Sequence, residues 1–159
     1  RPSVPATGPT VVNIGSIVGL FSTPFAGAYC SSKAALHALS DALRMEVAPL
    51  GVRVVTVQPG GVLSSFGNHA SELLHLPENS RYQAVAAGIH ARAKASQMGG
   101  TPADQFVQSV VQALLCANPP AVIRGGKGST MLPLLKRWLP LRRFDAILSR
   151  RFGLADWKP

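Results

Sequence analysis

The chain has 159 residues, of which 47% are hydrophobic and 14% are charged, and it carries a net charge of +9. This length and apolar content suit one folded domain with a buried core and exclude a disordered chain. Two cysteines are too few for a disulfide framework, which favours a reducing, intracellular compartment. The four histidines match no metal-ligand spacing, so we expect no metal site.

The first predicted strand runs from Thr10 to Gly15, a short β-branched and apolar stretch that ends in glycine. This pattern is typical of a strand buried in a parallel sheet. The loop at its carboxyl end then holds Ser16, whose hydroxyl can bind a carbonyl oxygen.

A helical pattern opens near Ala28 and extends to about Pro49. Tyr29 and Lys33 are four residues apart in it, so they project from the same face of the helix. An ammonium beside a phenol stabilises the phenolate, which equips the tyrosine to exchange a proton at cellular pH. The spacing alone also occurs by chance, where a solvated lysine flanks a half-buried tyrosine.

The second predicted strand lies between Gly51 and Gly61 and ends at Pro59. Strand, helix and strand in this order predict a parallel pair with a right-handed crossover. Open parallel sheets bind ligands beyond the carboxyl ends of their strands, where Ser16 and Pro59 both fall. The sequence therefore predicts one crevice suited to carbonyl–alcohol chemistry.

Three motifs in register resemble the second half of a short-chain dehydrogenase/reductase. They are Asn-Ile-Gly-Ser-Ile at 13–17, Tyr-Cys-Ser-Ser-Lys-Ala-Ala at 29–35 and Pro-Gly-Gly-Val-x-Ser at 59–64. The resemblance is clear from about Thr10 to Phe66 and rests beyond that on the pattern of helices. It implies an α/β fold, the C-terminal part of a Rossmann-like, doubly wound parallel sheet.

By this resemblance, Tyr29 is the catalytic acid/base, Lys33 tunes it and holds the nicotinamide ribose, and Ser16 positions the substrate carbonyl. The backbone from Pro59 to Val62 binds the nicotinamide carboxamide, and Ser64 stands where the family more often has threonine. The implied catalytic residues are Ser16, Tyr29 and Lys33, and the implied cofactor-binding residues are Tyr29, Lys33, Pro59, Gly60, Gly61, Val62 and Ser64.

Within the family, residues 12–19 and 29–44 most resemble the reductases that act on 1-acyl-dihydroxyacetone phosphate with NADPH. In the family, the residues that select NADPH over NADH precede the region of resemblance, so NADH stays an alternative. Retinol and steroid dehydrogenases share much of the same motif sequence, so activity on retinol or a steroid is a second hypothesis. A third hypothesis is a truncated, non-catalytic fragment associated with a membrane.

The family's glycine-rich turn and the first strands of its seven-stranded sheet have no counterpart in this sequence. We therefore expect the chain to be the C-terminal part of a longer enzyme, with a dehydrogenase unit at 1–126 that includes a substrate lid at about 63–100. Such a piece by itself leaves a parallel sheet edge unpaired and apolar surface exposed.

Residues 127–159 are predicted to form a basic amphipathic extension. From residue 121 onward the chain has nine Lys or Arg against two Asp or Glu, with leucines and aromatics interleaved. Three interpretations stay open: contact with an anionic membrane, a folded cover over the substrate pocket whose cations can receive a substrate phosphate, and nonspecific binding of nucleic acid. No nucleic-acid fold is recognisable, so no nucleic-acid partner is expected.

The expected partners are a small-molecule carbonyl or lipid substrate and, for the full-length protein, a further copy in a homo-oligomer. The expected location is intracellular, with the cytoplasmic face of the endoplasmic reticulum or a lipid droplet as candidates.

Overall fold

A computed structural model describes residues 8–155 and 157, so the first seven residues of the predicted 1–126 unit lie outside the described part, as do residues 156, 158 and 159 of the extension. The core is a parallel three-stranded sheet in the order β1-β2-β3. Its strands are β1 (Thr10–Ile14), β2 (Arg53–Pro59) and β3 (Val122–Gly125). The α/β fold class with a parallel sheet is confirmed.

The strands β1 and β2 differ in burial. β2 has a partner on each side, and every residue from Val54 to Gln58 is buried. β1 has one partner, and Ile14 at its end is 55% exposed. The strand expected at 10–15 is therefore present, and its exposure agrees with the expectation that this part of the fold leaves one edge of the parallel sheet unpaired.

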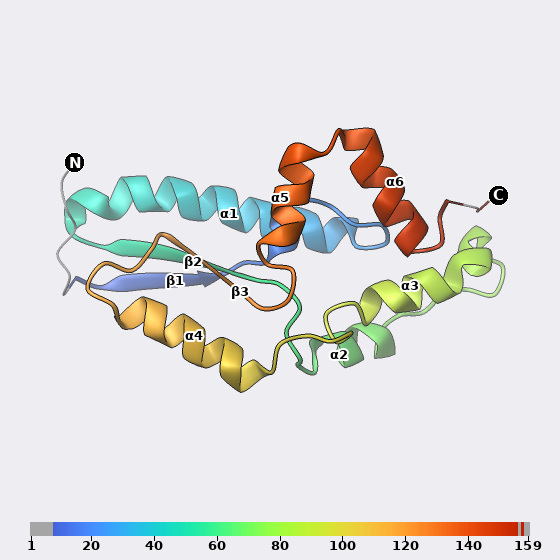
Figure 1. Cartoon of the computed structure of the whole chain (residues 1–159), viewed down its shortest axis with the longest axis horizontal. Helices are drawn as coiled ribbons and strands as arrows, with labels where there is room; N and C mark the ends of the chain where they lie inside the picture. The colour runs from blue at the N-terminus through green and yellow to red at the C-terminus, as the bar shows by residue number, and fades with distance from the viewer. Residues whose placement is uncertain (1–7, 156, 158–159) are drawn as a thin grey trace.

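Two helices cover the two faces of this sheet (Figure 1). On one face lies α1 (Gly27–Val47), rich in the strong helix formers alanine and leucine, and the chain leaves it through η2 (Ala48–Leu50). On the other lies α4 (Ala103–Leu115), which packs Val110 against the buried valines of β2. The two helices thus pack on opposite faces of the sheet and hold its strands together.

The predicted lid forms α2 (Phe66–Glu72), η3 (Arg81–Val85) and α3 (Ala86–Ala93). Residues 81–93 thus form a tight 3-10 turn followed by a short α-helix. Ser80 starts that turn, because its Oγ accepts a hydrogen bond from the Tyr82 N–H at 3.2 Å.

The basic extension folds into α5 (Met131–Trp138) and α6 (Leu141–Arg151), with Pro140 between them. Both helices stand beyond the carboxyl end of β1, and α6 descends toward α3 (Figure 1). A second hydrophobic core joins them to the loop that follows β1 and contains Ile17, Phe21, Phe144, Leu148 and Phe152. In the described part of the chain, no helix is both long and apolar enough to cross a bilayer.

Candidate active site

A cavity of about 520 Å³ opens beyond the carboxyl ends of β1 and β2. All eight residues singled out from the sequence lie on its wall. They are Ser16, Tyr29, Lys33, Pro59, Gly60, Gly61, Val62 and Ser64. The structure therefore brings together three motifs that lie up to about fifty residues apart in the chain.

Ser16 is separated from β1 by Gly15 and caps the short helix η1 (Ile17–Gly19), because its Oγ accepts a hydrogen bond from the Val18 N–H at 3.4 Å. The same hydroxyl donates to the Pro59 carbonyl oxygen at 3.5 Å, which is the long limit for such a bond. A carbonyl oxygen placed in the cavity can replace this weak acceptor. The hydroxyl is thus both positioned and available.

Tyr29 and Lys33 lie on successive turns at the start of α1 and both face the cavity. The Lys33 Nζ is 5.8 Å from the centre of the Tyr29 ring and donates a hydrogen bond to the Ile14 carbonyl oxygen at 2.9 Å. The ammonium is therefore tied to the end of β1 beside the phenol. The Tyr29 ring packs against that of Phe66, with the ring centres 5.4 Å apart.

His37 occupies the next turn of α1 and contacts the loop after β1 that contains Ser16 (the serine loop). Its side chain is buried, and its Nε2 accepts a hydrogen bond from the Ser16 N–H at 3.4 Å. Burial lowers the pKa of His37 below its ordinary value of 6.5, nearby Asp41 raises it, and Lys33 and Arg124 lower it further. A neutral imidazole is the form that can accept the Ser16 N–H.

The segment after β2 is fixed through its backbone by the loop after β3. The Gly60 N–H donates to the Gly125 carbonyl and the Gly61 N–H to the Lys127 carbonyl, each at 2.8 Å. A Cβ on Gly60 would collide with that Lys127 carbonyl oxygen, so this close approach requires glycine. Val62 lines the cavity, and within residues 8–155 and 157 its N–H has no protein acceptor.

The lid and the extension complete the wall of the cavity. Arg92 of α3 donates from its Nε to the Thr23 hydroxyl at 2.5 Å, and Leu132, Leu148 and Phe152 come from the extension. The structure thus shows the extension folded over this cavity. Among the described residues, no group of three or more His, Cys, Asp or Glu side chains lies close enough to hold a metal ion.

Sequence reasoning did not identify His37, Thr23 or Arg92. A signal existed for His37, because residues 29, 33 and 37 follow one another at intervals of four on the same helix. No comparable signal existed for the Thr23–Arg92 contact, whose partners are 69 residues apart.

Comparison with known proteins adds an independent line of evidence. The family model described as short chain dehydrogenase matches residues 5–73. The short-chain dehydrogenase cctT of Talaromyces islandicus is 39% identical over 91% of this chain and 52% of its own length. The NADPH-dependent 1-acyldihydroxyacetone phosphate reductase of Saccharomyces cerevisiae is 28% identical over 91% of this chain and 48% of its own length.

A solved structure, a short-chain dehydrogenase from Streptomyces avermitilis, matches 91% of this chain and 51% of its own with a TM-score of 0.61 and 25% identity. A parallel α/β sheet with a cavity at the carboxyl ends of its strands is the arrangement found in open, doubly wound α/β folds. The chain belongs to the short-chain dehydrogenase/reductase family. It spans about half the length of the curated relatives that it matches.

Proposed function

We propose that the full-length protein reduces a ketone to an alcohol with NADPH, and that Ser16, Tyr29 and Lys33 carry the reaction. The observation that supports this most is that all eight residues of the three motifs line one cavity. Membership of a family whose named relatives are dehydrogenases and reductases supports the same reaction type.

The cavity offers groups that fit a nicotinamide cofactor. A carboxamide needs a donor for its oxygen, and the Val62 N–H is a donor without a protein acceptor in the described residues. The Ser64 Oγ accepts a hydrogen bond from the Phe66 N–H at 3.4 Å and keeps its own proton to donate. The choice of NADPH over NADH rests on the named cofactor of the Saccharomyces cerevisiae relative. When bound, NADPH supplies a hydride to the carbonyl carbon.

The protein's own residues manage the proton and the negative charge in this proposal. Tyr29 gives its phenolic proton to the oxygen as the carbon is reduced, which leaves a phenolate. The adjacent Lys33 ammonium stabilises that phenolate and holds the cofactor ribose. The Ser16 hydroxyl keeps its proton and donates a hydrogen bond to the carbonyl oxygen instead of to the Pro59 carbonyl.

The proposed substrate is 1-acyl-dihydroxyacetone phosphate, which places the protein in lipid synthesis. Two features support this choice: the motif sequences resemble those of reductases that act on this compound, and the Saccharomyces cerevisiae relative is named for it. The apolar side chains that the extension adds to the cavity suit an acyl chain. A retinol or steroid dehydrogenase would keep the same catalytic residues and accept a different carbonyl compound.

The decisive experiment is Tyr29→Phe in the full-length protein. Removal of one proton donor should lower kcat by about 10²–10⁴-fold, with NADPH binding, measured by fluorescence, largely kept. Tyr82→Phe is the matched control, because that tyrosine is 47% exposed and does not line the cavity. Unchanged turnover in Tyr29→Phe would refute the assignment.

A substrate panel tests the finer proposal. Purified protein with NADPH should reduce 1-acyl-dihydroxyacetone phosphate with the highest kcat/KM, ahead of retinal and of 3-ketosteroids. A preference for retinal or a steroid would leave the catalytic residues as proposed and would reject 1-acyl-dihydroxyacetone phosphate as the substrate.

We also propose that the extension contacts an anionic membrane surface, at the endoplasmic reticulum or a lipid droplet. Its outer side carries apolar side chains in water, with Trp138 78% and Leu141 59% exposed. Exposed cations flank them at Arg137, Arg142 and Arg143. This combination suits an amphipathic element that lies in the headgroup region.

A further inference from the structure

The cavity has an unbalanced charge. Among residues 8–155 and 157, four cationic side chains line it, namely Lys33, Arg92, Lys127 and Arg151, and no aspartate or glutamate does. Cations that share a partly enclosed space repel one another, and they attract any anion that enters. Lys33 has a role in the proposed reaction, and the Lys127 Nζ donates to the Met98 carbonyl at 3.0 Å. Arg92 and Arg151 have no role in that reaction.

Arg92 is held in a fixed orientation. Its Nε donates to the Thr23 hydroxyl at 2.5 Å, and its side chain is half-buried. A guanidinium has five N–H donors, so this bond leaves both terminal amino groups, which have no acceptor in the described part of the chain. Two such groups in one plane match two oxygens of a phosphate.

The Thr23 contact also locates Arg92 along the cavity. Thr23 belongs to the loop between Ser16 and Tyr29, the two residues proposed to act on the substrate carbonyl. The donors that suit the nicotinamide carboxamide lie instead on the segment after β2. Arg92 is therefore anchored to the loop that carries the residues proposed to act on the substrate carbonyl.

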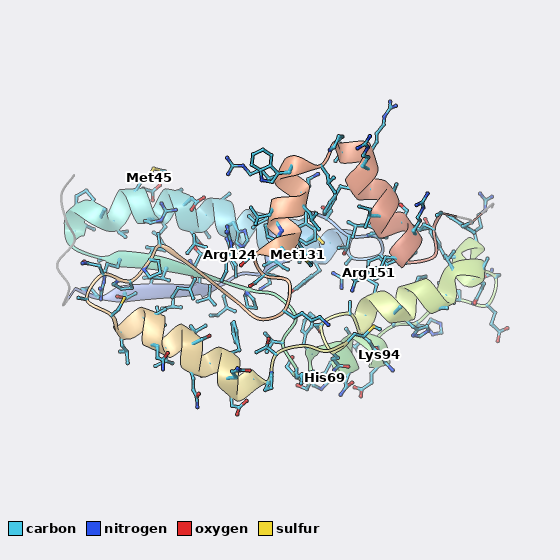
Figure 2. The ribbon with its side chains drawn as sticks, viewed as in Figure 1. Met45, His69, Lys94, Arg124, Met131 and Arg151 are labelled. Atoms are coloured by element: carbon cyan, nitrogen blue, oxygen red, sulfur yellow. The ribbon has the colours of Figure 1, made fainter. Side chains whose placement is uncertain are left out.

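Arg151 comes to the same cavity from another direction. It is the last residue of α6, and Figure 2 shows its side chain at the end of that helix that faces α3. Arg92 is near the end of α3, and a Cβ on Gly88 of α3 would collide with the Phe152 carbonyl oxygen. Gly88 lies one turn before Arg92, so the end of α6 packs against the face of α3 that carries Arg92, and both helices bring an arginine to the cavity.

Apolar side chains adjoin these arginines. Leu148 and Phe152, which flank Arg151 on α6 and just after it, line the cavity together with Leu132 of α5. Leu148 and Phe152 also belong to the buried core of the extension. A ligand that fits both surfaces has an anionic head and a hydrocarbon body.

We propose that Arg92 and Arg151 form a subsite for the phosphate of an amphiphilic phosphomonoester, with its acyl chain along Leu132, Leu148 and Phe152. This inference deepens the proposed function and rests on it for the reaction, because the phosphate of 1-acyl-dihydroxyacetone phosphate is the group bound. The subsite holds the substrate and takes no part in the hydride or proton transfer.

Binding of the reaction product tests the subsite without turnover. Titration calorimetry compares 1-acyl-glycerol 3-phosphate with the matching monoacylglycerol, which lacks the phosphate, on the full-length protein. In Arg92→Gln and Arg151→Gln, affinity for the phosphorylated lipid should fall by about 10- to 100-fold, with affinity for monoacylglycerol unchanged. Lys94→Gln and Arg150→Gln are matched controls, because neither residue lines the cavity.

Three measurements keep the outcomes separate. Melting temperatures and NADPH binding show that each variant is folded, and Arg92→Lys, which keeps the charge and loses the planar fork, should retain part of the affinity. Equal affinity in wild type and both glutamine variants, or equal loss for both lipids, would overturn the subsite.

Turnover then tests the reaction independently of binding. If phosphorylated lipid binds in an Arg92-dependent way and 1-acyl-dihydroxyacetone phosphate is not reduced, the subsite stands and the proposed substrate falls. If wild type and Arg92→Gln reduce that ketone with the same KM, the proposed function stands and the subsite falls.

Discussion

The strand side and the helix side of the cavity are built by different means. On the strand side, residues 14–62 are fixed by backbone contacts and buried polar groups, such as the Ser16 N–H on His37 and the Gly61 N–H on the Lys127 carbonyl. On the helix side, short helices of the lid and extension meet through side chains, among them the rings of Tyr82 and Trp157, stacked with centres 5.1 Å apart.

This difference separates two tasks. Backbone hydrogen bonds along a parallel sheet hold reacting groups in one arrangement whatever the substrate, and that suits the catalytic groups. Side chains on short surface helices can change without disturbing the sheet, and that suits recognition of the substrate. Changes on the strand side should therefore alter kcat, and changes on the helix side should alter KM.

The largest expected effect is on the strand side. Ser16→Ala removes one donor to the developing oxyanion, so kcat should fall by about 10²–10³-fold with a small change in KM. Steady-state kinetics with NADPH in excess measures both values, and Ser31→Ala on the exposed side of α1 is the control. A rise in KM with unchanged kcat would assign Ser16 to substrate binding and would contradict the division of catalysis and recognition between the two sides.

A smaller effect is expected where the lid meets the extension. Gly88→Ala places a Cβ against the Phe152 carbonyl oxygen, so α3 and the end of α6 must separate. KM for the ketone should rise by about tenfold, as for a lost charged hydrogen bond, with kcat and NADPH binding kept. Gly27→Ala is the matched control, because a Cβ there meets no atom within 4 Å. A large loss of kcat in Gly88→Ala would show that the helix side also positions the reacting groups.

The same division explains what the sequence could predict. Ser16, Tyr29 and Lys33 were identifiable because each belongs to a short contiguous motif whose spacing dictates its geometry. Thr23 and Arg92 were not, because their contact joins segments 69 residues apart that only the packing of α3 brings together. The exposure of Ile14 follows from the unpaired sheet edge that the resemblance implied, since a strand's composition alone does not reveal how many partners it has.

The outer surface of the extension should affect location more than catalysis. Arg142→Gln and Arg143→Gln should each lower binding to vesicles of 30 mol% phosphatidylserine by about fivefold, since one surface cation contributes about 1 kcal/mol. Vesicle co-sedimentation measures this, and turnover of a soluble ketone should not change. Glu78→Gln, an exposed acidic residue in the lid, is the control. Equal binding by all variants would leave the extension as a cover of the cavity alone.

The smallest expected effect concerns His37 and the pH dependence of stability. Because burial lowers its pKa in the folded state, the unfolded chain binds a proton at His37 more readily than the folded chain does. The stability that depends on the neutral imidazole is present above pH 6.5 and is lost as the pH falls toward the lowered folded-state pKa. The slope from this one group is at most about 1.4 kcal/mol per pH unit.

Chemical denaturation between pH 5 and pH 8 measures this slope. His37→Gln keeps an acceptor for the Ser16 N–H and cannot titrate, so its stability should vary less with pH than that of wild type. His90→Gln should retain the wild-type slope, because His90 is exposed. If His37→Gln keeps the same pH dependence, the imidazole of His37 is not the buried titrating group. The serine loop would then be held by its backbone, through the Gly15 N–H on the Val57 carbonyl oxygen. A reduced slope with unchanged kcat would instead show that His37 stabilises the strand side without controlling the chemistry on it.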